Sequence, residues 1–283
     1  LAGILRQAVG EAGVLATSGN QNNDIGMPLT LLGLRAGHRF AVIEMGMNHL
    51  GEIAYLSRLA RPTLALINNA GTAHIGELGS MHAIAEAKGE IFQGLDPAGV
   101  AVLNNDDVQA GFWRGLIGKR EVVSFGLENP ADVSARYELT DSGTLLTVRA
   151  RQGQFVCTLA VPGLHNVRNA LAAATAAFAL GLPAAQIGAG LAAYRGIKGR
   201  LQIRRHRSGA TVIDDSYNAN PDSMRAAIAV LAGCTGNKTL VMGDMGELGE
   251  DAEALHRAMG EAARSAGIDR LFALGELSAA TVR

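Results

Sequence analysis

The stretch Thr63-Leu64-Ala65-Leu66-Ile67-Asn68 decides the fold, because a short apolar run of this kind suits a strand that is buried on both faces of a sheet. Similar runs occupy residues 40–45 and 100–104, and amphipathic helical patterns near residues 51–60 and 81–93 separate the three. The sequence therefore predicts an α/β fold with a mostly parallel central sheet and helices on both of its faces.

Between residues 133 and 161 the apolar pattern changes to a period of two, which places Phe155, Cys157 and Leu159 on one face. Turn-forming residues at 141–143 and 152–153 divide this stretch into hairpin-length pieces. We expect an antiparallel meander beside the parallel sheet.

A second domain is expected after a linker at residues 196–199. Before the linker, residues 169–180 and 184–194 have helical patterns. Beyond it, the predicted strands are 210–213, 239–242 and 270–274, with helices after Pro221 and near 251–266. We predict a central domain at residues 1–198 and a partial Rossmann-like C-terminal domain at 199–283.

Both ends are expected to continue into further sequence. The helical pattern that starts at Leu1 has no capping residue and no preceding strand, and the pattern at residues 276–283 begins a helix that nothing completes.

Composition favours small-molecule partners in a reducing cytoplasm. The 25 basic residues nearly balance the 26 acidic ones, which disfavours nucleic acid and anionic membranes. No apolar run approaches the roughly 18 residues of a membrane span. The two cysteines are far apart in a chain without a secretory leader, so we expect no disulfide framework.

Glu44 and His74 follow predicted strands, so both should lie at the carboxyl edge of the sheet, where ligands bind. A carboxylate and an imidazole there could hold a divalent cation. The alternative is a solvated rim.

Lys88 lies on the apolar stripe of its helix, together with Met81, Ile84, Ala85, Ile91 and Phe92. A buried ammonium requires a partner, a lowered pKa or chemical modification. The alternative is a side chain that extends to Glu90 or to solvent.

Three further stretches offer polar groups to a ligand. The amide-rich loop at residues 19–26 could bind a polar ligand or only form turns. Asn166 and Asn169 share a face at a helix start, where one of them could act as a cap. Asp215 follows a strand and has no local role, whereas Asn220 and Pro221 suit helix positions N-cap and N1. The 243–249 stretch lacks the G-x-G-x-x-G spacing of a dinucleotide site.

Taken together and in order, these motifs resemble those of the Mur ligases over essentially the whole chain. They are the loop at 19–26, Val42-Ile43-Glu44-Met45-Gly46, Thr72-Ala73-His74, Ala87-Lys88-Gly89-Glu90-Ile91, His165-Asn166-Val167-Arg168-Asn169, Gly199-Arg200 and residues 215–221. The loop, 217–220 and 242–249 are most similar to the branch that joins D-alanyl-D-alanine to a UDP-N-acetylmuramoyl-tripeptide.

The resemblance implies a P-loop-type ATPase core and ATP-dependent amide formation through an acyl phosphate, with Mg²⁺, in peptidoglycan precursor synthesis. It assigns Glu44, His74 and a carbamylated Lys88 to magnesium and catalysis. It assigns the nucleotide to Asn166, Asn169, Arg200, Asp215 and Tyr217, and the muramoyl-peptide to Asn20, Asn22, Asn23 and Asp24.

The chain departs from the family pattern at its start. The first strand and the loop G-x-x-G-K followed by Ser or Thr should precede Leu1, as should a UDP-binding domain, and the far half of the third domain is also absent. We therefore expect this chain alone not to catalyse ligation. Two alternatives are a folylpolyglutamate synthetase-like ligase, which the amide-rich loop argues against, and a non-catalytic remnant or binding module.

Overall fold

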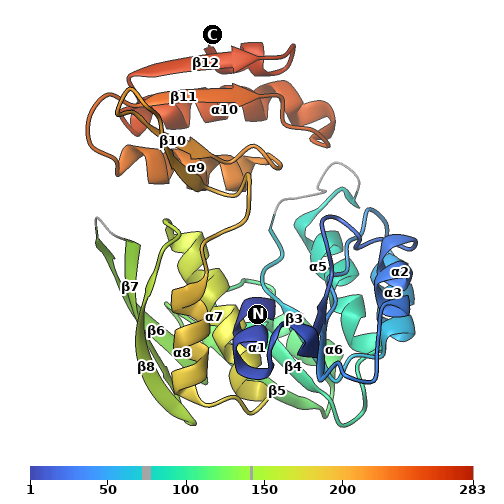
Figure 1. Cartoon of the computed structure of the whole chain (residues 1–283). Coiled ribbons are helices and arrows are strands. Elements are labelled where there is room, and N and C mark those ends of the chain that lie inside the picture. The colour runs from blue at the N-terminus through green and yellow to red at the C-terminus, as the bar shows by residue number, and fades with distance from the viewer. Residues whose placement is uncertain (72–77, 141–142, 283) are drawn as a thin grey trace. The chain divides into compact units, whose positions relative to one another are not determined.

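The computed structural model describes residues 1–71, 78–140 and 143–282 (Figure 1). Contacts divide the chain into two compact units. The first contains Leu1–Ala70, Met81–Ala160 and Val167–Tyr194, and the second contains Gly71–Ser80, Val161–Asn166 and Arg195–Arg283. None of the described helices is both long and apolar enough to cross a bilayer. The predicted boundary between residues 198 and 199 stays a prediction.

The main sheet of the first unit has six strands in the order β3-β4-β5-β6-β7-β8. Their bounds are β3 (Leu64–Ile67), β4 (Val100–Asn104), β5 (Glu121–Gly126), β6 (Val133–Thr140), β7 (Gly143–Ala150) and β8 (Gly153–Leu159). Strands β3 to β6 run parallel, and β6 to β8 form antiparallel pairs. The predicted combination of a parallel sheet and an antiparallel meander is confirmed. The pattern of β5 was not recognised in the sequence.

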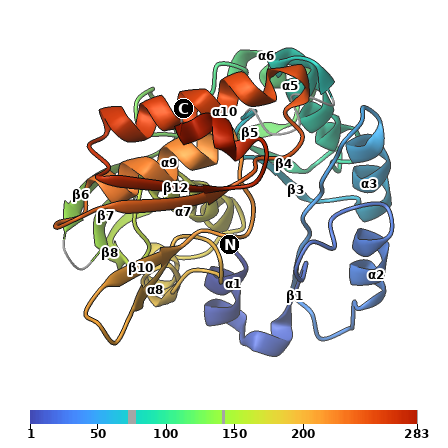
Figure 2. The same cartoon turned by 90° about the horizontal axis from the view of Figure 1, so that it is seen from above.

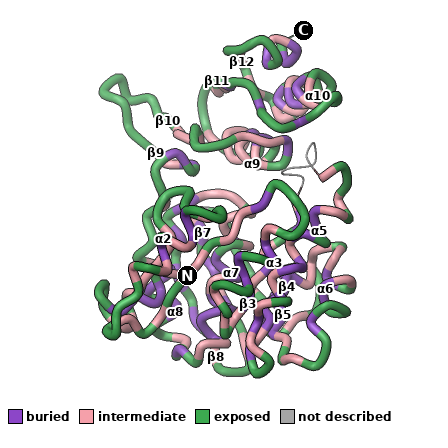
Figure 3. Tube along the Cα trace, turned by 90° about the vertical axis from the view of Figure 1, so that its right-hand side faces the viewer, coloured by how far each residue is buried: buried purple, intermediate pink, exposed green. Residues whose placement is uncertain are grey.

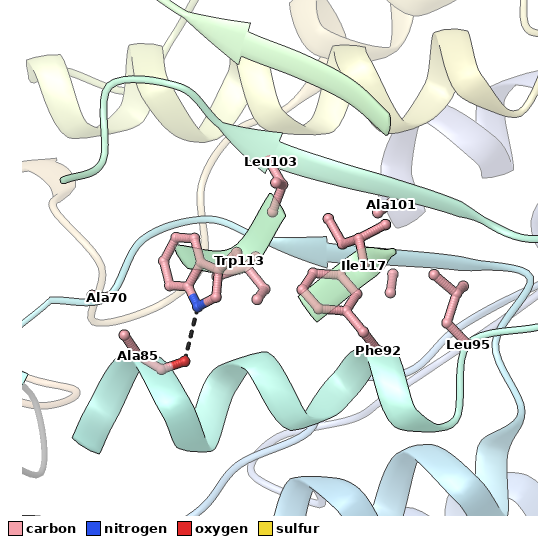
Figure 4. Close-up of a cluster of buried hydrophobic side chains, with 10 residues drawn as sticks. Ala70, Ala85, Phe92, Leu95, Ala101, Leu103, Trp113 and Ile117 are labelled. Atoms are coloured by element: carbon pink, nitrogen blue, oxygen red, sulfur yellow. Dashed lines mark hydrogen bonds between the residues drawn. The ribbon is translucent and has the colours of Figure 1, made fainter. Parts of the chain in front are cut away.

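A buried cluster lies between the parallel strands and the helices beside them. The helices of this unit are α1 (Ala2–Val9), α2 (Gly26–Leu32), α3 (Glu52–Ala60), α5 (Met81–Gly89), α6 (Ala110–Ile117), α7 (Leu164–Ala179, from Val167 on) and α8 (Ala184–Ala193). Phe92, Leu103 and Ile117 belong to the same buried cluster as Trp113, whose Nε1 donates a 2.8 Å hydrogen bond to the carbonyl oxygen of Ala85 (Figure 4). This bond satisfies the one polar group that the indole carries into the core. The buried stretches of the unit include much of α7, β3 and β4 (Figure 3).

Two sequence predictions differ from the structure in this unit. The expected strand at 40–45 is only β2 (Phe40–Val42), and it pairs in parallel with β1 (Val14–Ala16) rather than with the six-stranded sheet, so that β1, α2 and α3 lie on one side of the unit (Figure 2). The helix expected at 81–93 ends at Gly89 and continues as the 3-10 turn η2 (Glu90–Gln93). A second 3-10 turn, η1 (Glu11–Gly13), precedes β1.

The second unit contains two small sheets and two long helices. Its elements are β9 (Gln202–Arg205), β10 (Thr211–Asp214), α9 (Pro221–Ala232), β11 (Thr239–Gly243), η3 (Gly249–Asp251), α10 (Ala252–Ser265), β12 (Arg270–Leu274) and η4 (Ser278–Val282). Strands β11 and β12 pair in parallel, as expected. Strand β10 instead pairs antiparallel with β9, which the sequence analysis missed. Asn220 and Ser223 form a reciprocal capping box ahead of α9, with Pro221 at its start.

Candidate functional site

The amide-rich loop lies against the segment that follows β2. Asn22 Nδ2 donates to Glu44 Oε1 at 2.9 Å, and the Gly46 amide donates to the Asn22 carbonyl at 2.8 Å. The backbone N–H of Glu44 is held in turn by Thr17 Oγ1 at 2.9 Å. The structure therefore brings together two predicted site residues, Asn22 and Glu44, and leaves the Glu44 carboxylate exposed.

The other predicted residues of this loop divide between turn formation and exposure. Asn23 Oδ1 accepts hydrogen bonds from the backbone N–H groups of Gly26 at 2.8 Å and Ile25 at 3.3 Å, so its side chain shapes the start of α2. Asn20 and Asp24 are exposed. The loop passes so close to the helix start that a Cβ on Gly26 would lie 2.5 Å from the Cα of Gln21. Glycine is required there.

Lys88 is partly buried, and its ammonium donates two hydrogen bonds to backbone carbonyls. Its Nζ donates to the carbonyl oxygens of Asn69 at 2.9 Å and Ala70 at 2.5 Å. Burial lowers the pKa of Lys88, and the nearby Asp107 carboxylate opposes that shift. The ammonium is thus satisfied by backbone carbonyls, and the interpretation in which it extends to Glu90 is wrong.

Glu90 has another role that the sequence did not reveal. The residue is 8% exposed, and its carboxylate accepts hydrogen bonds from the backbone N–H groups of Gly51 at 2.7 Å and Ala54 at 3.1 Å. These groups belong to the first turn of α3, whose N–H groups have no partner within the helix. Glu90 therefore caps α3 from a distant part of the chain, and its charge suits the positive end of the helix dipole.

Residues 68–70, just after β3, are bound by side chains from distant parts of the chain. We call these residues the 68–70 segment. Asn104, at the end of β4, donates through Nδ2 to the Asn68 carbonyl at 3.0 Å, and Asp107 Oδ2 accepts from the Ala70 N–H at 2.8 Å. Asn68 Nδ2 donates to Asn169 Oδ1 on α7 at 2.7 Å. Lys88 binds the same segment, so two predicted site residues, Lys88 and Asn169, both make hydrogen bonds to residues 68–70.

Asn68, Asn104 and Asp107 were missed by the sequence analysis, although a signal was present. Asn68 directly follows one apolar strand, Asn104 ends the next, and Asp107 lies three residues beyond it, and the two strands were predicted to run parallel. The carboxyl ends of parallel strands meet at one edge of the sheet, so these side chains were bound to lie close together.

In the second unit the structure brings three predicted residues together. Asp215 Oδ1 accepts from the Leu201 N–H at 3.0 Å, and the Arg200 guanidinium lies 4.2 Å from the centre of the Tyr217 ring. The Tyr217 N–H donates to the Gly199 carbonyl at 3.1 Å. Gly199 has a φ of +73°, and a Cβ there would lie 3.2 Å from the Tyr217 nitrogen. The result is a compact group with an exposed cation stacked on an aromatic ring.

Two predicted residues are not brought into these groups. Asn166 Nδ2 donates to the Pro162 carbonyl at 2.7 Å, and the residue lies inside α7, which begins at Leu164. His74 lies outside the described residues. Among the residues that are described, no three His, Cys, Asp or Glu side chains gather as a metal site would require, and the prediction of a magnesium site stays a prediction.

Comparison with known proteins identifies the family. The model of the Mur ligase middle domain matches residues 1–177, and that of the Mur ligase, glutamate ligase domain, matches residues 199–283. The chain belongs to the Mur ligase family.

Individual relatives agree with this assignment. The chain is 44% identical over 266 residues to the UDP-N-acetylmuramoyl-tripeptide–D-alanyl-D-alanine ligase of Escherichia coli, covering 93% of this chain and 59% of that protein. A crystal structure of MurF from Acinetobacter baumannii superposes with a TM-score of 0.93 at 39% identity, covering 99% of this chain and 62% of the other. MurF from Thermotoga maritima in complex with ADP gives 0.87 at 26% identity, covering 99% and 65%. The chain thus spans about three fifths of the length of its curated relatives.

Proposed function

We propose that this Mur ligase chain contributes the nucleotide-binding and catalytic groups of a ligase that joins D-alanyl-D-alanine to UDP-N-acetylmuramoyl-tripeptide with the use of ATP. The 44% identity to a protein of that name over 93% of the chain carries the proposal. The same comparison disfavours a folylpolyglutamate synthetase-like ligase.

The reaction consists of two substitutions. A carboxylate oxygen of the tripeptide attacks the γ-phosphorus of ATP, the bond to the β–γ bridging oxygen breaks, and ADP leaves. The amine of D-alanyl-D-alanine then attacks the acyl carbon, phosphate leaves with the bonding electrons, and the amine loses a proton. Both steps bring negative charges together, so positioning and charge neutralisation are the main demands on the protein.

Several described residues suit the nucleotide. Asn169 is exposed, and its amide oxygen is occupied by Asn68, so its Nδ2 can donate to a ligand acceptor. Arg200 is exposed beside Tyr217, which makes it available to phosphate oxygens. We assign Asp215 to ribose or adenine, as the resemblance implies, and keep Asn166 as a further candidate.

Mg²⁺ would supply charge neutralisation when bound. Glu44 suits it, because within the described residues its exposed carboxylate binds Asn22 through Oε1 alone, and the hard oxygen ligands that Mg²⁺ prefers include carboxylates. We further propose that Lys88 is carbamylated. Its lowered pKa favours the neutral amine that attacks carbon dioxide, and the carbamate N–H can keep one of the two carbonyl bonds.

We assign Asn20, Asn22, Asn23 and Asp24 to the muramoyl-peptide, with Asn22 placed best because it contacts Glu44 directly. The two free cysteines fit the reducing cytoplasm that we propose as the compartment.

The test is a ligation assay with the complete gene product that carries this sequence. We expect ADP release that requires both other substrates, and a product heavier than the tripeptide precursor by D-alanyl-D-alanine less one water. Glutamate with a folate as the productive pair would support the alternative ligase, and nucleotide binding without turnover would support the binding module.

Binding by the 283-residue chain tests the residue assignments separately. Calorimetry should show that Asn169→Ala and Asp215→Ala each weaken ATP binding, whereas Asn129→Ala does not. Lys88→Ala should abolish turnover of the complete gene product, with partial recovery in short-chain carboxylic acids. Unchanged affinities, or near wild-type turnover of Lys88→Ala, would remove these assignments.

A further inference from the structure

We infer that Asp107 is a positioning residue of the ligase: it orients the peptide group between Asn69 and Ala70, and that peptide group holds the Lys88 amine. The inference rests on the proposed function for its kinetic consequence. Its geometric content rests on contacts within the first unit alone.

One peptide group lies between two side chains of opposite charge. Its carbonyl oxygen, on Asn69, accepts from Lys88 Nζ at 2.9 Å, and its N–H, on Ala70, donates to Asp107 Oδ2 at 2.8 Å. The negative end of the peptide dipole therefore faces the ammonium, and the positive end faces the carboxylate. Each charge polarises the amide in the direction that strengthens the other hydrogen bond.

Asp107 is itself fixed from the opposite side. Its second oxygen, Oδ1, accepts from the Gln109 N–H at 2.8 Å, at the residue before α6. Both carboxylate oxygens are thus in use, one on the helix start and one on the 68–70 segment. The position of α6 in the core is transmitted through Asp107 to the peptide group that binds Lys88.

An asparagine cannot replace this carboxylate. It offers one acceptor oxygen where two N–H groups point at the side chain, and its NH₂ would face one of those donors. Asp107→Asn therefore keeps the volume and loses one of the two contacts. When the lost contact is the one to the Ala70 N–H, the peptide group is no longer fixed on that side, and the Asn69 carbonyl, one of the two carbonyl partners of Lys88, is displaced.

Asp106 supplies a matched control one residue earlier. Its carboxylate accepts from the backbone N–H groups of Leu127 at 2.7 Å and Asn129 at 2.8 Å, among others, and is therefore as strongly engaged as Asp107. It makes no hydrogen bond to the 68–70 segment in the described structure. Asp106→Asn applies the same chemical change to the neighbouring loop and tests for general loosening of the fold.

The first measurement does not depend on activity. Lys88 acetylation by a brief pulse of an N-hydroxysuccinimide ester is measured in carbonate-depleted buffer, where Lys88 is a free amine. It is followed by peptide mass spectrometry at a temperature where circular dichroism shows every variant folded. We expect the Lys88 rate to rise about tenfold in Asp107→Asn, the order expected when a hydrogen bond to a charged group is lost, and to stay at the wild-type value in Asp106→Asn.

The second measurement is the ligation rate of the complete gene product. We expect Asp107→Asn to lower kcat by on the order of 100-fold with little change in KM for the UDP-substrate, because misplacement of a catalytic group by about 1 Å has that effect. Asp107→Glu keeps the charge but displaces the carboxylate, and should resemble Asp107→Asn.

The outcomes separate the two proposals. If the wild-type protein shows no ligation, the proposed function is wrong, and the acetylation result still decides the role of Asp107. Equal Lys88 acetylation in wild type and Asp107→Asn, equal effects of the Asp106 and Asp107 variants, or full activity of Asp107→Glu would each overturn the positioning role.

Discussion

Removal of the Glu90 carboxylate should destabilise the first unit far more than removal of an exposed charge on the adjoining helix α5. The carboxylate is buried and accepts two backbone N–H groups of α3, at 2.7 and 3.1 Å. A hydrogen bond to a charged group contributes about 1.5–3 kcal/mol, and the charge at the helix start adds about 0.3–1 kcal/mol.

The two N–H groups respond differently to the loss. Gly51 is exposed, so water replaces the carboxylate there, whereas Ala54 is 6% exposed and its N–H stays unpaired. For Glu90→Ala we therefore expect a decrease of about 3–4 kcal/mol in the free energy of unfolding, below the sum of both bonds. Glu90→Gln keeps one acceptor and should lose about 1–2 kcal/mol.

The assay is urea unfolding followed by tryptophan fluorescence. The chain has one tryptophan, Trp113, and it is fully buried in the same unit, so its emission reports the transition of interest. Glu86→Ala is the control, because Glu86 is exposed on α5 and its loss should change stability by no more than about 0.5 kcal/mol. If Glu90→Ala and Glu86→Ala unfold at the same urea concentration, the capping role of Glu90 is refuted.

Three other changes have equally definite outcomes. Trp113→Phe leaves the Ala85 carbonyl without its 2.8 Å donor and opens a void, so we expect the free energy of unfolding to fall by about 2–4 kcal/mol. The measurement is urea unfolding followed by circular dichroism, and a decrease below about 0.5 kcal/mol would contradict the packing in Figure 4. In the second unit, buried His256 accepts from the Met245 N–H through Nε2 at 2.9 Å and contacts the Ala252 carbonyl through Nδ1 at 2.7 Å. His256→Phe should therefore lower the free energy of unfolding by about 2–4 kcal/mol, and an unchanged melting curve would show that neither bond matters. Burial raises the pKa of Cys157 to about 11, so iodoacetamide at pH 8 should modify Cys234 first, and the Cys157 rate should rise as the pH approaches 11; equal rates at pH 8 would contradict its burial.

Sequence patterns were sufficient to predict strands wherever the apolar period matches the side chains that face the core. The apolar runs at β3 and β4 and the alternating meander follow from side chains facing a core, and the structure has them at the predicted residues. The N-cap at Asn220, with Pro221 at N1, was equally readable, because a cap is a local interaction, whereas the reciprocal bond of Ser223 was not predicted.

Interactions across the chain were not readable in this way. Glu90 caps a helix whose first turn is 36 residues earlier, and the sequence alone offered Lys88 as its neighbour instead. Lys88 proved to bind backbone carbonyls, which carry no signature in a sequence because every residue has one. Strand β2 was placed in the wrong sheet for a related reason, since its partner β1 has only three residues and little pattern of its own.

The join between the parallel sheet and the meander has a consequence for hydrogen exchange. Strands β5 and β6 are paired only at Phe125 with Val133 and at Gly126 with Ser134, whereas the β6–β7 and β7–β8 ladders run along nearly the whole strands. Separation of the meander from β5 therefore breaks few inter-strand bonds, while opening within the meander breaks many. Its amides should exchange together, as one cooperative unit whose opening leaves β3 to β5 closed.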